Sequence, residues 1–130
     1  MSMEQTPRLK KVIDLARIEA SGVGASAPGS EHLLLGIALE GGSVPAKVLA
    51  KYGIDPDGIR RDLSGAASSD DLLAAAEAVA LKLGHDVVGT EHLLLALIED
   101  WDTAAARLLI RKGVSPREVS KVILDLLASQ

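Results

Sequence analysis

The 130-residue sequence has no cysteine and no phenylalanine, and it contains a single tryptophan and a single tyrosine. Without cysteine there is no disulfide framework, no thiol nucleophile and no thiolate metal ligand. Because aromatic residues make up only 2% of the chain, leucine, isoleucine, valine and alanine have to fill the core, which suits closely packed helices. A chain of this length is expected to fold as one domain.

Long apolar runs and an excess of positive charge are absent as well. No run reaches the roughly 18 residues of a membrane-spanning helix, and residues 1–5 lack the apolar stretch of a signal peptide, so we expect a cytoplasmic protein without a membrane partner. The net charge of −4 and the pI near 5.3 argue against a nucleic-acid partner. A basic group spreads over more than one helix face and indicates a solvated surface. It consists of Arg8, Lys10, Lys11 and Arg17.

The sequence does contain an internal repeat. Residues 30–35 read Ser-Glu-His-Leu-Leu-Leu and residues 90–95 read Thr-Glu-His-Leu-Leu-Leu, at an offset of 60 positions; we call these segments the Glu-His motifs. A fixed period is typical of a duplicated structural unit. The prediction is an all-α fold of two tandem four-helix repeats, about 6–65 and 66–127, related by a pseudo-twofold axis and packed as one eight-helix domain over residues 1–130.

Apolar periodicity and turn residues predict the four helices of each repeat. Ser30 and Thr90 are expected to be the N-caps of two helices that are apolar on every side and therefore buried. Gly53 is expected to be a left-handed C-cap. In the first repeat the helices cover 7–20, begin at 30, cover 43–52 and begin at 55–56; in the second they cover 70–83, begin at 90, cover 103–112 and begin at 115–116.

Motifs of catalysis and nucleotide binding do not support an enzyme. The loop over residues 22–29 contains Gly-x-Gly-x-x-Ala, but a dinucleotide fingerprint follows a strand, and here a helix precedes it. No Gly-x-x-x-x-Gly-Lys-Ser/Thr loop occurs, and no Ser/His/Asp spacing suggests nucleophilic catalysis. We therefore predict a protein without catalytic residues, cofactor or bound metal.

The motif histidines, His32 and His92, follow the predicted caps by two positions. The positive end of the helix dipole favours a neutral ring there, so a structural hydrogen bond is the favoured interpretation. A metal site shared across the pseudo-twofold axis is the alternative, although the chain has no His-x-x-x-His pair.

The motif glutamates, Glu31 and Glu91, follow the predicted caps directly, and the position of a capping-box carboxylate is taken by leucine. One interpretation is that they only complement the helix dipole, which contributes about 0.3–1 kcal/mol. The other is that each carboxylate accepts an incoming guanidinium group, since the two pair bidentately.

Trp101 stands in the turn after the second buried helix, where the first repeat has Gly41. A lone tryptophan is either a plug over the helix ends or an exposed anchor that contacts a partner. The plug is the favoured interpretation, and the partner contact stays as the alternative.

These residues together resemble the Clp N-terminal domain, the double-repeat, all-helical module of unfoldases of the ClpA, ClpB and ClpC type. The paired Glu-His motifs, each preceded by a glycine loop, carry the resemblance, which covers about residues 6–127. Residues 83–97, which read Leu-Gly-His-Asp-Val-Val-Gly-Thr-Glu-His-Leu-Leu-Leu-Ala-Leu, are especially similar to the ClpC pattern.

The resemblance implies a monomeric, non-catalytic binding module that docks Clp unfoldase–protease components or their adaptors and substrates. ClpC-like members recognise phosphorylated arginine, and the family glutamates that contact its guanidinium match Glu31 and Glu91. The neighbouring Ser30 and Thr90 are expected to help, because helix N-termini favour anions such as phosphate.

Some positions depart from the family pattern. The residues leading into each first helix are Gln5-Thr6 and Ala67-Ser68 instead of Phe-Thr or Phe-Ser, which weakens the case for a surface that binds cyclic-peptide antibiotics. The loop of the first repeat lacks the usual histidine, so the first phospho-arginine pocket is expected to be the weaker one. The preferred reading is a free-standing accessory protein, since the chain finishes a helix without a linker. An antibiotic-sequestering decoy and an excised N-domain of a full-length ClpC-type AAA+ unfoldase are the alternatives.

Overall fold

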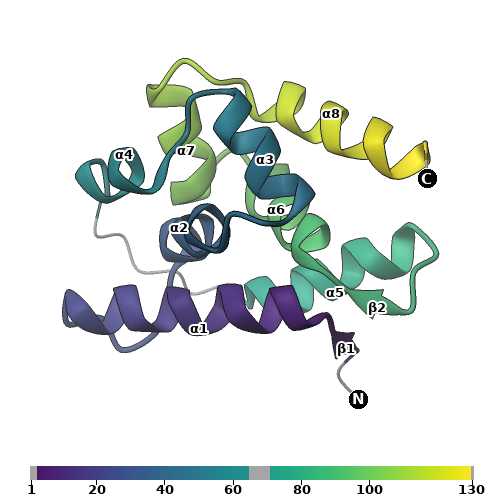
Figure 1. Ribbon diagram of the computed structural model, residues 1–130, viewed down its shortest axis with the longest axis horizontal. Helices are drawn as coiled ribbons and strands as arrows, with labels where there is room; N and C mark the ends of the chain where they lie inside the picture. Colours follow the sequence, from purple (N-terminus) through teal and green to yellow (C-terminus); the bar gives the residue numbers. More distant parts are fainter. Residues whose placement is uncertain (1–2, 65–70, 130) are drawn as a thin grey trace.

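The computed structural model describes residues 3–64 and 71–129, and within them it contains eight helices and two very short strands. The all-α prediction is therefore confirmed (Figure 1). The first four helices are α1 (Pro7–Gly22), α2 (Ser30–Glu40), α3 (Val44–Lys51) and α4 (Pro56–Arg61). The second four are α5 (Leu72–Lys82), α6 (Thr90–Glu99), α7 (Ala104–Arg111) and α8 (Pro116–Ala128).

Capping side chains define most helix starts, as the sequence predicts. Thr6, Ser43, Asp55 and Ser115 each accept a hydrogen bond from a backbone N–H of the first turn, and a proline follows within two positions. At the other end of α3, Gly53 has a φ of +79°, which confirms the predicted left-handed residue.

The predicted N-caps of the two buried helices are wrong by one residue. Ser30 and Thr90 are the first residues inside α2 and α6, and the caps are the extended glycines Gly29 and Gly89. Glycine has no side chain that could accept the orphan N–H groups of the first turn, and neither helix start has a side-chain cap hydrogen bond of that kind.

The helices α2 and α6 form the centre of the molecule. In Figure 1 they lie between α1 and α5 on one side and α3, α7 and α8 on the other, and α2 contacts α6 directly. Leu34 and Leu94, one in each Glu-His motif, have no exposed surface, and burial of such a side chain contributes about 1.5–3 kcal/mol. A Cβ atom at Gly36 would lie 2.5 Å from the carbonyl oxygen of Val12, so α1 and α2 pack too closely for any larger residue.

A pair of two-residue strands, β1 (Glu4–Gln5) and β2 (Val87–Val88), was not predicted. The strands are parallel, and Thr6 N–H donates to the carbonyl oxygen of Val88 at 3.0 Å. The pairing joins the start of the first repeat to the loop before α6. Residues that lead into α1 thereby lie next to the second Glu-His motif.

Other sequence predictions concern membranes and the segment between the repeats. No single helix of the described part of the chain is long and apolar enough to cross a membrane; α2 and α3 together meet a test of length and composition but are bent by 96°. The predicted linker over 64–69 and the residues Ala67-Ser68 that precede α5 lie outside the described residues, apart from Ser64.

Candidate binding site

Each motif histidine accepts a hydrogen bond from the backbone N–H of the glycine that caps its helix. Nδ1 of His32 accepts a hydrogen bond from Gly29 N–H at 3.2 Å, and Nδ1 of His92 accepts one from Gly89 N–H at 2.9 Å. The predicted structural hydrogen bond is confirmed, with each histidine at the third helical position instead of the second. This bond is the half of a capping box in which the third helical residue accepts the N–H of the cap, and it uses neither the hydroxyl nor the carboxylate of the motif.

The second motif contains a histidine pair that sequence reasoning missed. His85 Nδ1 and His92 Nε2 are 2.7 Å apart. Since His92 Nδ1 accepts from Gly89, its proton must sit on Nε2 and point to His85. Burial lowers the pKa of His92; the carboxylate of Glu91 opposes this shift and His85 adds to it. The first repeat has Ala25 at the position of His85, and this contrast between the repeats was the available signal.

The first carboxylate, Glu31, is satisfied within the protein. The residue is 2% exposed, and its two oxygens accept the backbone N–H of Ser64 at 3.1 Å each. The Ser64 hydroxyl donates to Oε1 at 2.8 Å, and a guanidinium nitrogen of Arg111 lies 3.8 Å from Oε2. The chain's own guanidinium therefore occupies the place that an incoming one would take.

The second carboxylate, Glu91, is open. Its side chain is 28% exposed, and within the described residues no lysine or arginine lies in ion-pair range of it. Its 3.5 Å contact with His92 Nδ1 is not an ion pair while that nitrogen accepts from Gly89. A Cβ atom at Gly89 would collide with the Glu91 carboxylate, so glycine here leaves room for the side chain to fold back toward the helix start.

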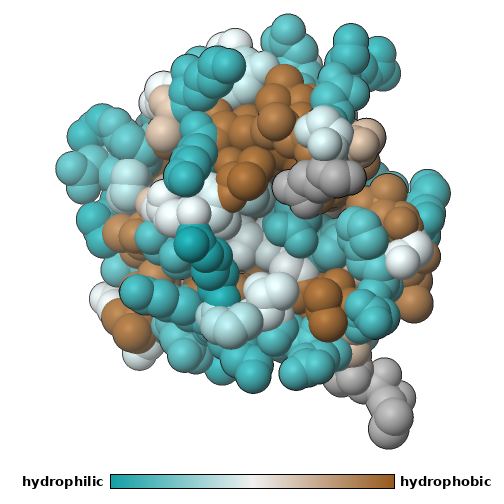
Figure 2. Space-filling model, turned by 45° about the vertical axis from the view of Figure 1, so that its right-hand side comes forward, coloured by the Kyte–Doolittle hydropathy of each residue, from teal (hydrophilic) through white to brown (hydrophobic). Residues whose placement is uncertain are grey.

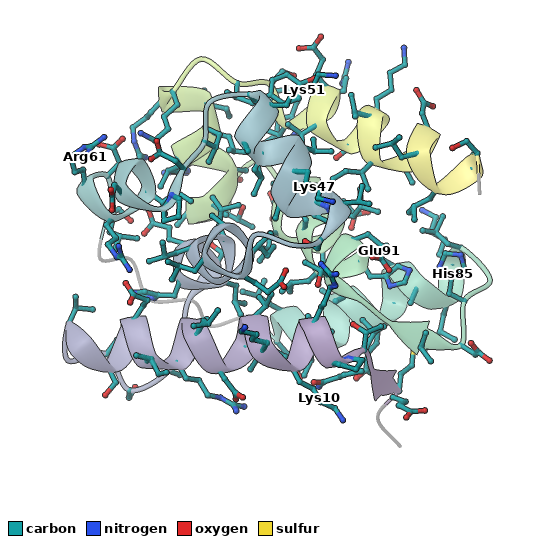
Figure 3. The ribbon with its side chains drawn as sticks, viewed as in Figure 1. Lys10, Lys47, Lys51, Arg61, His85 and Glu91 are labelled. Atoms are coloured by element: carbon teal, nitrogen blue, oxygen red, sulfur yellow. The ribbon has the colours of Figure 1, made fainter. Side chains whose placement is uncertain are left out.

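The difference between the two carboxylates follows from residues elsewhere in the repeats. The counterpart of Ser64 is Leu124, whose side chain has no hydrogen-bond donor. The counterpart of Arg111 is Lys51, which Figure 3 shows well away from Glu91, toward the opposite end of α3. Neither counterpart closes the second site.

The two motif hydroxyls differ as well. Ser30 Oγ accepts the N–H of Ala105 at the start of α7, at 3.0 Å. The counterpart of Ala105 is Pro45, which has no N–H to donate. Thr90 Oγ1 is buried and, within the described part of the chain, has no hydrogen-bond partner. Such a group costs about 1–3 kcal/mol until a ligand or water satisfies it.

Thr90 and Glu91 line a cavity of about 550 Å³, which we call the Thr90 cavity. In Figure 3 Glu91 and His85 lie between α8 and the start of α1, which agrees with the lining residues. One side of the cavity is polar and the other is apolar, and Figure 2 shows apolar residues gathered between polar ones on this side of the molecule. The polar lining includes Thr6, Arg8, Ser43, His85, Thr90 and Glu91, and the apolar wall consists of Val44, Ile123, Leu126 and Leu127.

Arg8 is the cation at the rim of the Thr90 cavity. Its guanidinium lies 3.8 Å from Glu40 Oε2, and its side chain is 56% exposed, so the pairing is weak. Glu40 Oε1 meanwhile accepts the N–H groups of Gly42 and Ser43 at 3.0 and 3.1 Å. Arg8 can therefore turn toward an anion in the cavity while Glu40 keeps its backbone contacts.

Trp101 is not a buried plug. It is 49% exposed and lines a different hollow, and the Cζ atom of Arg117 lies 5.7 Å from its ring centroid.

The alternative of a metal site shared between the motif histidines has no support in the described residues. Residues 3–64 and 71–129 contain no group of three or more His, Cys, Asp or Glu side chains that could hold a metal ion.

Comparison with known proteins finds the Clp repeat (R) N-terminal domain twice in this chain, over residues 4–71 and 67–130. The chain is 35% identical to the "Negative regulator of genetic competence ClpC/MecB" of Bacillus subtilis (strain 168), over 95% of this chain and 17% of that protein. It is equally similar to "Chaperone protein ClpB" of Oceanobacillus iheyensis, with the same coverage. The chain thus spans 17% of the length of these curated relatives.

Solved structures agree on the fold. The N-terminal domain of the chaperone ClpD from Arabidopsis thaliana superposes with a TM-score of 0.76 at 20% identity, covering 96% of this chain and 95% of that one. The N-terminal domain of Hsp104 from Candida albicans gives a TM-score of 0.79 at 19% identity, covering 98% and 93%. At these identities the likeness concerns the fold alone.

Proposed function

Because the chain belongs to the Clp repeat (R) N-terminal domain family, we propose that it is a non-catalytic protein-binding module that recognises substrates or adaptors for a Clp unfoldase–protease. Relatives that carry the same domain are named as chaperones or as an ATP-binding subunit of Clp protease. One observation carries the proposal: the Glu91 carboxylate opens into a cavity with a polar side and an apolar wall. Such a cavity suits a charged side chain presented on a protein segment.

The ligand that fits the polar side best is phosphorylated arginine. Its guanidinium would pair with the Glu91 carboxylate, as carboxylates and guanidinium groups do bidentately. Its phosphate would accept from the Thr90 hydroxyl, which lacks an internal partner, and from Arg8 at the rim. The start of α6 adds the positive end of a helix dipole.

This assignment puts one ligand, not two, on each molecule. Glu31 has the same place in its motif, but Ser64 and Arg111 already satisfy it. An incoming guanidinium would have to displace a charge of its own kind from a buried carboxylate. We therefore propose that the Thr90 cavity is the only phospho-arginine site of the two.

Calorimetric titration with a phospho-arginine peptide tests the proposal. We expect one site per chain, and we expect both Glu91→Ala and Glu91→Gln to weaken binding at least about tenfold, which corresponds to about 1.4 kcal/mol. Thr90→Val should weaken peptide binding less than the Glu91 variants do. Glu31→Gln keeps a side-chain oxygen that can accept from Ser64, so it should leave the affinity for the peptide unchanged.

Two matched ligands complete the titration. The same peptide with unmodified arginine should bind at least about tenfold more weakly, because it lacks the phosphate that Thr90 and Arg8 would contact. A cyclic peptide antibiotic tests the decoy function. Binding of the cyclic peptide with no heat from phospho-arginine, or loss of phospho-arginine binding in Glu31→Gln alone, would contradict the proposal.

A further inference from the structure

The second place where the repeats differ lies between the first and fourth helix of each. In the first repeat, Arg60 of α4 reaches Glu19 of α1, with Nε 2.8 Å from Oε1, and Asp57 at 3.3 Å. This ion-pair cluster bridges the two helices. In the second repeat, Ser120 stands at the position of Arg60, Val79 at that of Glu19 and Arg117 at that of Asp57.

The bridge is replaced by an open hollow of about 400 Å³ between α5, α6 and α8, which we call the Trp101 groove. Its walls are apolar, and two of its side chains, Trp101 and Leu124, are 49% and 41% exposed. Its volume is within the range of about 300–1,000 Å³ that ligand sites occupy. The apolar lining consists of Val79, Leu83, Leu95, Ile98, Trp101 and Leu124.

The groove carries positive charge at its edge, although the protein as a whole has a net charge of −4. Lys82 and Arg117 both line it, against one acidic residue, Glu99. Within residues 3–64 and 71–129 neither cation has a carboxylate in ion-pair range, whereas Arg60 in the first repeat has two. The guanidinium of Arg117 lies over the Trp101 ring, which holds the charge at the rim.

From this geometry we infer that the Trp101 groove docks a partner protein through a segment in which apolar side chains stand next to carboxylates. The apolar walls would bury the partner's apolar side chains, and Lys82 and Arg117 would pair with its carboxylates. The inference does not depend on the Thr90 cavity, because Glu91 lines that cavity and not the groove, and Trp101 lines the groove and not that cavity.

Trp101 supplies the readout, because it is the single tryptophan of the chain and stands at the rim of the groove. The probe is an acetylated octapeptide of alternating leucine and aspartate, titrated to ~1 mM. A Kd of ~1 mM corresponds to a binding free energy of about −4 kcal/mol. We expect a saturable change in tryptophan fluorescence. The counterpart with asparagine for aspartate should bind several-fold more weakly, and the counterpart with lysine should not bind.

A charge variant and a transplant of the first repeat's bridge are the decisive variants. Arg117→Glu should weaken the leucine–aspartate peptide at least about fivefold. Val79→Glu/Ser120→Arg introduces the ion pair that Glu19 and Arg60 form at the corresponding positions of the first repeat. The fold should therefore tolerate the two substitutions, and circular dichroism tests whether it does. This variant should lose the fluorescence response altogether.

Three results would overturn the inference. They are no response to the leucine–aspartate peptide at ~1 mM, an equal response to the lysine peptide, and full binding by the folded Val79→Glu/Ser120→Arg variant. A response to dilution of the protein alone would identify a second copy as the occupant and would overturn it too. Glu91→Ala serves as the control, since it should weaken phospho-arginine binding at least about tenfold and leave the fluorescence titration unchanged, so the two proposals fail separately.

Discussion

The two Glu-His motifs share a helix start, a capping histidine and a buried leucine, yet they have opposite surroundings. Around the first, the hydroxyl and the carboxylate have internal partners: Ser30 accepts from the start of α7, and Glu31 contacts Ser64 and Arg111. Around the second, Thr90 has no partner in the described chain and Glu91 faces a cavity.

The same contrast recurs at the outer faces of the repeats. An ion-pair cluster bridges α1 and α4, while α5 and α8 leave the Trp101 groove open. Duplication has therefore kept one scaffold and divided its tasks. The first repeat uses its polar side chains for internal contacts, and the corresponding positions of the second repeat are those to which we assign outside partners.

The buried leucines that the two repeats share should contribute equally and strongly to stability. Leu34→Ala and Leu94→Ala each remove a side chain with no exposed surface, so each should lower the free energy of unfolding by about 3–5 kcal/mol. Urea unfolding followed by circular dichroism measures this. Leu126→Ala, at a residue that is 40% exposed, should cost less than about 1 kcal/mol. A cost confined to one repeat would break the symmetry of the scaffold.

The carboxylates should show unequal effects on stability. Glu31→Ala leaves the Ser64 donors and the Arg111 guanidinium without their acceptor, so it should lower the free energy of unfolding by about 1–3 kcal/mol. Glu91→Ala removes no internal partner and should change it by less than about 0.5 kcal/mol. Thermal unfolding of both variants under one condition provides the measurement. Similar losses in the two would show that Glu91 also holds the fold.

Much of this contrast could not be predicted from the sequence, because it depends on residues far apart in the chain. Periodicity, caps and turns identified the helices, and the repeat of Leu34 as Leu94 identified the core. Ser64 and Arg111 close the first site from 33 and 80 positions away, and no local pattern connects them to Glu31. Comparing the repeats position by position, as with Pro45 opposite Ala105, would have been the nearest available signal.

Two errors have local physical causes. The N-caps were placed at Ser30 and Thr90 because hydroxyl residues are strong caps, but both helices begin at these residues, after extended glycines whose N–H groups are bonded to the histidine at the third helical position. Trp101 was expected to be a plug over the helix ends because large apolar side chains are usually buried, but it is 49% exposed. Here the groove beside it is open, since position 79 is a valine and cannot form the bridge that Glu19 makes.

His92, in the second motif, should make the free energy of unfolding depend on pH. The pKa of His92 is below its unfolded value of about 6.5, so between the two values the unfolded chain binds more protons and stability falls as pH falls. For this single group the slope cannot exceed about 1.4 kcal/mol per pH unit, and it should vanish as pH rises well above the unfolded pKa of about 6.5. His92→Gln keeps an acceptor for Gly89 N–H and should lose this component of the slope. An unchanged slope in thermal melts over that range would assign the pH dependence to other groups.

The hydroxyls should have effects of opposite sign, and these are the smallest we expect. Ser30→Ala deprives the Ala105 N–H of its acceptor, so stability should fall by about 1 kcal/mol. Thr90→Val removes a buried hydroxyl that has no internal partner and keeps its shape, so stability should rise by up to about 1 kcal/mol. Urea unfolding measures both.

A double-mutant cycle tests whether Pro45 is the reason why the Thr90 hydroxyl lacks the backbone donor that Ser30 has. Pro45→Ala restores the backbone N–H that the counterpart, Ala105, donates to Ser30. If the Thr90 hydroxyl then accepts it, Pro45→Ala should be more favourable by about 1 kcal/mol in the presence of Thr90 than in the Thr90→Val background. Zero coupling energy would mean that the Thr90 hydroxyl does not accept the restored N–H, and that proline at position 45 is not the reason why this hydroxyl lacks a partner in the described part of the chain.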